Sequence, residues 1–223
     1  MKPFQIDLLE FLLKNNVLQF GSFTLKSGRP SPYYYNARNL NSGQALAKIG
    51  QVYAEKILSD MKDTDVIFGP AYAGIPLVAA TAVQLALKGK NIRFAYDRKE
   101  AKTYGDAKTG AVIMGEVKTG DRLLLIDDMV TTGGTKLEVR DKIEKSVPGV
   151  AFTGILVVFD RKEKDDAGIY SGDALKNAGM PLYSILDAPS VFDYLHVHEV
   201  NGKKQLTEEQ YLAFQEYRKK YGA

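Results

Sequence analysis

The chain has 223 residues, 45% of them hydrophobic, which is enough for one large domain with a buried core. Its 30 Lys and Arg residues against 27 Asp and Glu residues leave a formal charge of +3, too small to predict a dedicated nucleic-acid or membrane-surface protein. The lack of cysteine excludes disulfides, thiolate nucleophiles, zinc–thiolate sites and iron–sulfur clusters, and only His196 and His198 are present for a catalytic triad or a histidine metal site. We expect both histidines to be structural and the chemistry to use Lys, Arg, Asp and backbone groups, with a dissolved metal ion if one is needed.

The hydrophobic pattern also excludes a membrane span. The longest weakly polar stretch, residues 73–87, contains Pro76 and is shorter than a membrane-spanning helix. Asp7 and Glu10 interrupt the apolar pattern at the N-terminus, which predicts an amphipathic helix rather than a secretory signal. We expect a soluble cytoplasmic protein.

Hydrophobic spacing predicts a chain in which strands and helices alternate. Residues 21–32 are rich in turn-forming residues, and residues 98–110 are polar and basic and predict a long exposed loop. Helices are predicted near residues 4–12, at 42–59, 74–87 and 135–145, near Val191 and at 208–219, and strands at 66–68, 92–96, 111–114, 123–126, 155–159 and 182–186. This alternation predicts an α/β domain with a central, mainly parallel sheet flanked by helices, and a ligand site at the carboxyl ends of the strands.

The strongest functional signal is the string LLLIDDMVTTGGTK at residues 123–136. A buried strand delivers Asp127 and Asp128 to its carboxyl end, where carboxylates suit hydroxyl groups or a hydrated cation. The threonines and glycines that follow lie at a helix N-terminus, where unpaired N–H groups and the helix dipole favour a phosphate; they are Thr131, Thr132, Gly133, Gly134 and Thr135. Neither a Walker loop nor a Gly-x-Gly-x-x-Gly string occurs, so the loop as a whole predicts a sugar-phosphate site.

A turn with threonine caps and an incidental acidic pair would explain any single residue of this string, but not the whole. The string closely resembles the phosphoribosyl pyrophosphate (PRPP) binding motif of type I phosphoribosyltransferases. Four further segments resemble the orotate phosphoribosyltransferases within that family, in the expected order: a hood over the base, a pyrophosphate loop, a catalytic loop and a strand end that holds the orotate carboxylate. These segments are residues 20–36, 68–76, 96–106 and 158–163.

The resemblance implies the type I phosphoribosyltransferase fold as a single domain over residues 1–223. Residues 1–40 with C-terminal elements would form the small hood, and residues 60–190 the PRPP-binding α/β core. It implies catalytic roles for Lys99, Lys102, Asp127 and Asp128. It implies PRPP contacts from Lys26, Tyr72, Ala73, Arg98, Lys99, Lys102, Asp127, Asp128, Met129, Val130, Thr131, Thr132, Gly133, Gly134 and Thr135. It implies orotate contacts from Tyr34, Tyr35, Thr131 and Arg161.

Each group has a plainer interpretation. The tyrosines at 33–35 are also typical of a half-buried strand. Arg98, Lys99 and Lys102 are also what a solvated charged loop contains, although nearby glycines suit a lid over phosphates. Arg161 could be a surface arginine after a strand.

Two positions depart from the pattern of better-known members of the family. Ala73 stands where those members usually have lysine, which removes a cation beside pyrophosphate and leaves a backbone N–H. Tyr104 stands where they usually have histidine, so it can donate a hydrogen bond but carries no positive charge. We expect weaker PRPP binding than a lysine at position 73 would give.

The resemblance implies transfer of the phosphoribosyl group from PRPP to orotate, giving orotidine 5′-monophosphate and pyrophosphate. It implies Mg²⁺ as cofactor, held mainly through PRPP and water, with no protein metal ligand. It also implies a homodimer that shares the 98–110 loop between subunits, with no nucleic-acid or membrane partner. Two alternatives stay open: a phosphoribosyltransferase that salvages a purine or another base, and a PRPP-sensing regulator.

Overall fold

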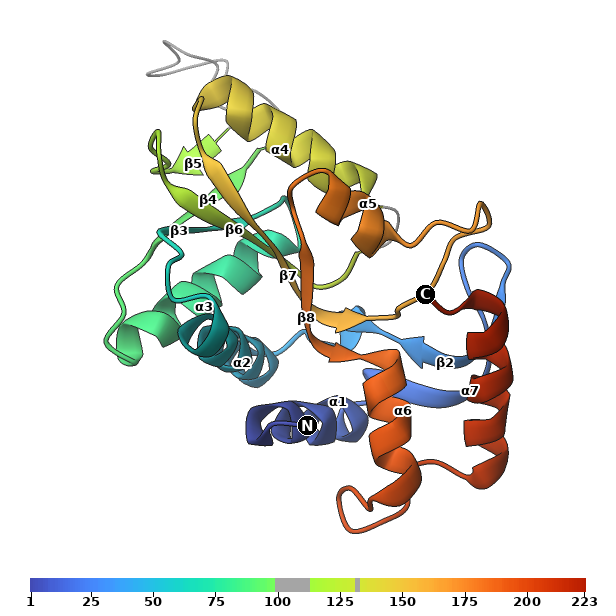
Figure 1. The fold of residues 1–223 in the computed structure, drawn as a ribbon. Helices are drawn as coiled ribbons and strands as arrows, with labels where there is room; N and C mark the ends of the chain where they lie inside the picture. The colour runs from blue at the N-terminus through green and yellow to red at the C-terminus, as the bar shows by residue number, and fades with distance from the viewer. Residues whose placement is uncertain (99–112, 131–132) are drawn as a thin grey trace.

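The computed structural model describes residues 1–98, 113–130 and 133–223. Strands and helices alternate along most of its length (Figure 1). The elements are α1 (Pro3–Lys14), β1 (Leu18–Thr24), β2 (Pro30–Tyr35), the 3₁₀ helix η1 (Ala37–Asn39), α2 (Gly43–Asp60), β3 (Val66–Gly69), α3 (Gly74–Leu87), β4 (Arg93–Asp97), β5 (Ile113–Gly115), β6 (Arg122–Asp127), α4 (Gly134–Ser146), β7 (Ala151–Asp160), α5 (Ser171–Asn177), β8 (Leu182–Asp187), α6 (Ala188–Val197) and α7 (Glu208–Tyr221).

The larger sheet has the strand order β5-β4-β3-β6-β7-β8. Its neighbouring strands are parallel except β4 and β5, which confirms the predicted mainly parallel sheet. Val66 of β3 pairs with Leu123 of β6, so the two strands end at the same edge. The turns after Gly69 and Asp127 therefore open on the same side of the molecule.

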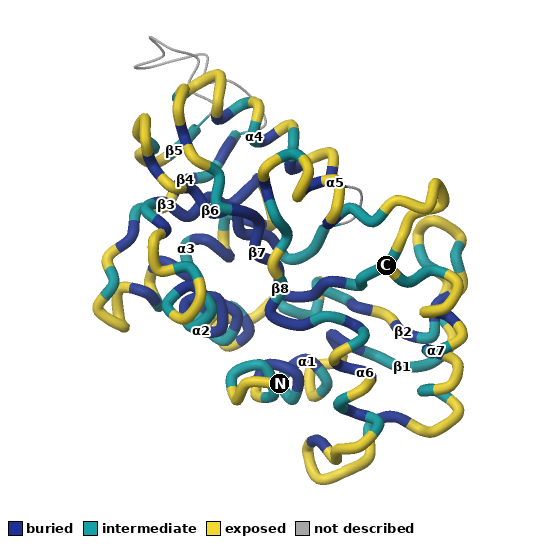
Figure 2. The backbone as a smooth tube through the Cα atoms, in the orientation of Figure 1, coloured by how far each residue is buried: buried dark blue, intermediate teal, exposed yellow. Residues whose placement is uncertain are grey.

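Helices cover both faces of this sheet, because side chains along a strand point alternately to opposite sides. On β6, Leu124 and Ile126 pack into the apolar cluster that includes α2 and α3, whereas Leu123 and Leu125 pack into the cluster that includes α4 and α5. Figure 1 shows the two helix pairs on opposite sides of the sheet, and Figure 2 shows the buried strands between them.

The smaller sheet consists of β1 and β2, which are antiparallel, with Phe20 opposite Tyr33. It packs beside α7 and α1. Its inward tyrosines join the same apolar cluster as one face of the large sheet, and Tyr35 stacks on Phe159 of β7 with ring centroids 5.1 Å apart. The small sheet is thus attached to the end of β7, where the strand leaves the core.

Each strand and helix predicted from spacing overlaps an element of the structure, but β1, η1 and α5 were not predicted, and β2 was considered only as the plainer interpretation of residues 33–35. The turn prediction for residues 21–32 was wrong at both ends, where β1 continues through Gly21 to Thr24 and β2 begins at Pro30. Glycine and serine inside LQFGSFT hide the alternation typical of a strand. The seven residues of α5 are too few to show helical periodicity. Among the described residues, no helix combines the length and apolar character that a membrane crossing requires.

Candidate active site

The turn between β6 and α4 carries the acidic pair. β6 is buried from Leu123 to Asp127, so its apolar side chains fix the place where the carboxylates emerge. Gly133 precedes α4 with φ of +80°, a conformation that L side chains rarely adopt, and a side chain there would also press on Leu175. α4 then begins at Gly134 and Thr135, and the N–H groups of its first turn lie at this end of the sheet. The predicted contacts Thr131 and Thr132 lie outside the described residues.

The two aspartates have different surroundings. Asp127 is 6% exposed; its Oδ1 accepts the Asp128 N–H at 2.9 Å, and its Oδ2 forms an ion pair with Lys136 Nζ. Asp128 Oδ1 accepts the Met129 N–H at 2.8 Å. Burial, and after it the adjacent carboxylate of Asp127, raises the pKa of Asp128 from 3.8 to about 6.

The turn between β3 and α3 lies beside this pair and is closed by two glycines. A methyl group on Gly69 would lie 2.2 Å from the carbonyl oxygen of Gly74, so the strand end and the helix start meet backbone to backbone. The Ala71 N–H donates to Asp97 Oδ1 at 2.6 Å, which ties the turn to the end of β4. Ala73 and Asp128 line one pocket of about 440 Å³.

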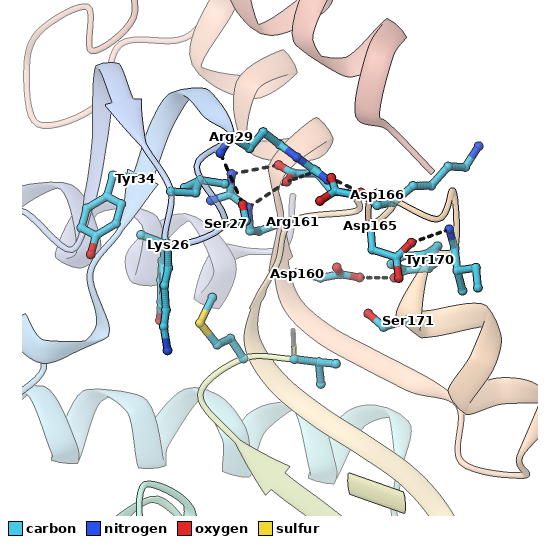
Figure 3. A pocket seen from close by; sticks show the side chains of 17 residues that line it. Lys26, Ser27, Arg29, Tyr34, Asp160, Arg161, Asp165, Asp166, Tyr170 and Ser171 are labelled. Carbon is cyan, nitrogen blue, oxygen red and sulfur yellow. Dashed lines mark hydrogen bonds and ion pairs between the residues drawn. The ribbon is translucent and has the colours of Figure 1, made fainter. Parts of the chain in front are cut away.

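A larger pocket of about 690 Å³ lies between the small sheet and the end of β7 (Figure 3). Lys26 from the β1–β2 turn and Tyr34 from β2 lie on one side of it, and Asp160 and Tyr170 on the other. The predicted site residues that line it are Lys26, Tyr34, Tyr35, Met129, Val130 and Arg161. Residues from the hood, the PRPP motif and the strand end thus meet at one cavity.

Arg161 is held in this pocket by a dense polar network. Its Nε donates to Glu163 Oε2 at 3.1 Å, its Nη2 donates to Ser31 Oγ at 3.0 Å, and its guanidinium lies 4.1 Å from the ring centroid of Tyr33. Glu163 also accepts the hydroxyls of Tyr33 at 2.6 Å and Tyr217 at 2.9 Å. The Arg161 side chain is 16% exposed, so its interpretation as a surface arginine is wrong.

The three consecutive tyrosines alternate along β2: Tyr33 and Tyr35 are buried in the core, as the plainer strand interpretation expects, and Tyr34 is exposed. Tyr34 and the edge of Tyr35 also line the large pocket. Tyr34 is 37% exposed and stacks on Phe23. The Tyr35 hydroxyl is buried and has no hydrogen-bond partner among the described residues.

Sequence reasoning missed the residues that hold Arg161 and close the far side of the pocket. Glu163 lies two positions after Arg161, so the acidic neighbour was a usable signal. Tyr170 gave none, because its hydroxyl donates to Asp160, which lies ten positions earlier in the chain. Arg29 gave none either, because it donates at 2.9 Å to Asp166 Oδ1, which lies 137 positions later.

Other predicted residues lie beyond the two pockets. Lys99 and Lys102, with Tyr104, lie outside the described residues, and Arg98 is the last described residue before them. Of the described site residues, those that line neither pocket are Tyr72, Arg98, Asp127, Gly133, Gly134 and Thr135. Tyr72 is 66% exposed on the β3–α3 turn, next to Ala73.

Known proteins are similar to this chain in sequence and in architecture. The family model for the phosphoribosyl transferase domain matches residues 36–183. The orotate phosphoribosyltransferases of Chromohalobacter salexigens and of Pseudomonas aeruginosa PAO1 are each 39% identical to this chain, over 100% of it and over 96% and 100% of their own lengths. The crystal structure of Francisella tularensis orotate phosphoribosyltransferase is 36% identical, with a TM-score of 0.83 and coverage of 97% of this chain and 100% of that one. The Mycobacterium tuberculosis enzyme in complex with PRPP is 25% identical, with a TM-score of 0.59 and coverage of 83% and 96%.

Proposed function

The chain belongs to the orotate phosphoribosyltransferases, and from that premise we propose how its two pockets divide the reaction. The reaction transfers the 5-phosphoribosyl group of PRPP to orotate and gives orotidine 5′-monophosphate and pyrophosphate in pyrimidine biosynthesis. The large pocket takes the base, and the turns at the ends of β3 and β6 take PRPP.

One observation carries the base assignment: a buried, pre-oriented arginine shares a cavity with a lysine and two tyrosines. Orotate is flat and anionic, so it suits the aromatic rings of Tyr34 and Tyr35 and the cationic groups of Arg161 and Lys26. Thr131 would complete this set. Residues 1–40 and the C-terminal elements act as the hood, a role supported by the Tyr217 hydroxyl of α7, which bonds to Glu163.

PRPP would lie along the ends of β3 and β6. Its 5-phosphate suits the N-terminus of α4 and the turn of residues 131–135. Its pyrophosphate suits the β3–α3 turn, with Tyr72, the Ala73 N–H and Arg98, and its ribose hydroxyls suit the acidic pair. At these positions the substrate's anionic and hydroxyl groups each meet groups of complementary chemistry.

Catalysis then needs stabilisation of leaving pyrophosphate. The bond from C1 of PRPP to pyrophosphate breaks through an oxocarbenium-like state, and orotate N1 forms a bond to C1 and gives up its proton. Lys99 and Lys102 supply positive charge to the leaving group, and exclusion of water protects PRPP from hydrolysis. Replacing Lys102 with alanine should lower turnover far more than it weakens orotate binding.

Mg²⁺ fits this site as an ion carried by the substrate. The described residues contain no group of three or more His, Cys, Asp or Glu side chains able to hold a metal ion. Pyrophosphate and ribose oxygens with water would supply its ligands, and the ion would neutralise charge that develops on the leaving group.

Two further parts of the proposal concern the assembly and the compartment. The chain acts as a homodimer in which the 98–110 loop serves the partner subunit, and it acts in the cytoplasm, in keeping with its cysteine-free sequence. Mixing Lys102→Ala protein with Asp128→Asn protein should restore part of the activity that each lacks. A strict monomer in sedimentation would contradict the shared loop.

The function is tested by the ultraviolet absorbance of orotate in the presence of Mg²⁺ and PRPP. We expect consumption that requires PRPP and that does not occur with purine bases. Arg161→Met should raise the KM for orotate by roughly tenfold to a hundredfold with little change in the KM for PRPP, because a hydrogen bond to a charged group is lost. Arg122→Met, at the other end of β6, is the control; consumption of a purine in place of orotate would refute the assignment.

A separate experiment tests the effect of alanine at position 73, where better-known members of the family usually have lysine. Ala73 lies at the start of α3, where a longer cationic side chain would meet pyrophosphate. Ala73→Lys should therefore bind PRPP more tightly in a titration without orotate. Unchanged affinity would show that the backbone N–H already supplies what the site needs.

A further inference from the structure

The buried surface of α4 begins with a lysine. Its buried residues are Lys136, Val139 and Ile143, which recur at the spacing of the stripe that faces the sheet. Two of them are apolar, and the first is a charged side chain that is 9% exposed. Burial of an ammonium group is costly unless it is paired, so this lysine calls for an explanation.

Its partner is Asp127, and both carboxylate oxygens of Asp127 have a partner within the protein. Oδ2 meets Lys136 Nζ, and Oδ1 accepts the N–H of Asp128 at 2.9 Å. The hydroxyl of Tyr53, on α2, fixes the same residue through its backbone, donating to the Asp127 carbonyl at 2.5 Å. Asp127 is thus held by contacts within the protein.

Asp128 is placed differently. It lines the pocket of about 440 Å³ together with Ala73, and no ion pair between described residues includes it. The titratable groups around it are Asp127, Lys136, Tyr53 and, from β2, Tyr35. Burial raises the pKa of both tyrosines, so they remain neutral hydroxyls beside the carboxyls.

We propose that Lys136 is a positioning residue that withdraws Asp127 from substrate binding, so that Asp128 alone receives the ribose hydroxyls of PRPP. The assignment of the ribose rests on the function proposed above, whereas the ion pair stands independently of it. Two adjacent carboxylates would otherwise compete for one proton. By neutralising Asp127, Lys136 lets Asp128 stay ionised at neutral pH.

The first experiment measures kcat/KM for PRPP against pH in Lys136→Met. Without the cation, the acid limb of the profile should move up by about one pH unit, and kcat/KM at a pH on that limb should fall about tenfold. PRPP itself titrates in this pH range, so the quantity to compare is the difference in the midpoint of the acid limb between the unmodified protein and the variant. Lys136→Arg, which keeps the charge, should restore much of the limb. Lys145→Met, an exposed lysine in the last turn of α4, should leave it unchanged. A loss of activity that is uniform across pH, with the limb in place, would overturn the proposal.

The second experiment replaces the carboxylates instead of the lysine, so it tests the proposal even if Lys136→Met does not fold. Asp128→Asn should weaken PRPP binding, titrated without orotate, at least about tenfold more than Asp127→Asn does. An equal or larger loss in Asp127→Asn would overturn the proposal. In the double variant Lys136→Met with Asp127→Asn, the loss of PRPP binding free energy should be smaller than the sum of the losses in the two single variants, since the lysine acts through Asp127.

The two hypotheses fail separately. If the unmodified protein does not consume orotate with PRPP, the proposed function is wrong. If it does so while Asp127→Asn is the more damaging change, the function stands and the division of the acidic pair is wrong.

Discussion

Two regions of the molecule hold their functional groups by different means: the large pocket around Arg161, proposed to bind the base and called the base pocket below, and the turns after β3 and β6, proposed to bind PRPP and called the PRPP end. In the base pocket, side chains from distant segments are paired with one another: Glu163 accepts hydrogen bonds from Arg161, Tyr33 and Tyr217. At the PRPP end, the path of the backbone provides the site, through turns closed by glycines such as Gly69. The base pocket should therefore be sensitive to loss of a charge, and the PRPP end to the addition of a single carbon atom.

The largest effect is expected from Glu163→Ala. It leaves the Arg161 guanidinium buried beside two tyrosine hydroxyls without its carboxylate, which should cost about 3–5 kcal/mol of unfolding free energy. The KM for orotate should rise as well. Urea unfolding and orotate kinetics check both effects.

Two controls separate charge pairing from general damage. Glu163→Gln retains the shape and an acceptor and should cost less. Asp166→Asn removes the exposed partner of Arg29, which should cost no more than about 1 kcal/mol. If Glu163→Ala were no worse than Asp166→Asn, the buried network would not hold the base pocket together.

Gly69→Ala tests the opposite half. The added methyl group meets the Gly74 carbonyl oxygen at 2.2 Å, so the backbone must shift, at a cost of about 1–3 kcal/mol. We expect a higher KM for PRPP and little change in orotate binding. Gly43→Ala is the matched control for stability, because nothing lies within 4 Å of its added carbon. Equal losses of stability in the two variants would contradict a site built from close backbone approach.

The difference between these two regions also explains which parts of the site could be predicted from the sequence. The PRPP end is local: the run from Leu123 to Asp127 and the glycines after it predict a buried strand and a phosphate turn from adjacent letters. The base pocket lies between β2 and the end of β7, and α7 supports it through Tyr217, so the role of Tyr217 depends on a contact with Glu163, 54 positions earlier, that no spacing encodes. Glu163 itself, two positions after Arg161, was the neighbour that the sequence could have indicated. Lys136 was missed for another reason, since a lysine in a helical stretch is normally exposed.

A pH series on the protein without substrate tests the PRPP end further. Because burial raises the pKa of Asp128 to about 6, the folded protein binds a proton between pH about 4 and 6 that the unfolded chain has released. This contribution to stability is complete below about pH 4 and is lost as the pH rises through about 6. Unfolding free energies of the unmodified protein should therefore fall, relative to Asp128→Asn, over this range.

Asp65, whose pKa is lowered instead of raised, provides the control for this pH series. The pKa of Asp65 is lowered to about 2, chiefly by hydrogen bonds from the Arg122 side chain. Its contribution is present above about pH 4 and is lost as the pH falls toward 2. Asp65→Asn should therefore leave the difference between pH 4 and 7 almost unchanged. Parallel curves for the unmodified protein and Asp128→Asn would contradict the raised pKa.

The smallest effect is expected from Tyr35→Phe, where the two halves of the site meet. The Tyr35 hydroxyl is buried in the large pocket without a partner among the described residues, and an unsatisfied buried hydroxyl costs about 1–3 kcal/mol. Its removal should leave the free protein as stable as before or about 1 kcal/mol more stable, while the stack on Phe159 is kept. If substrate supplies the missing acceptor, the KM for orotate or PRPP rises in the same variant. A gain in stability with a loss of affinity would mark a group kept for binding, whereas unchanged kinetics would assign Tyr35 to packing alone.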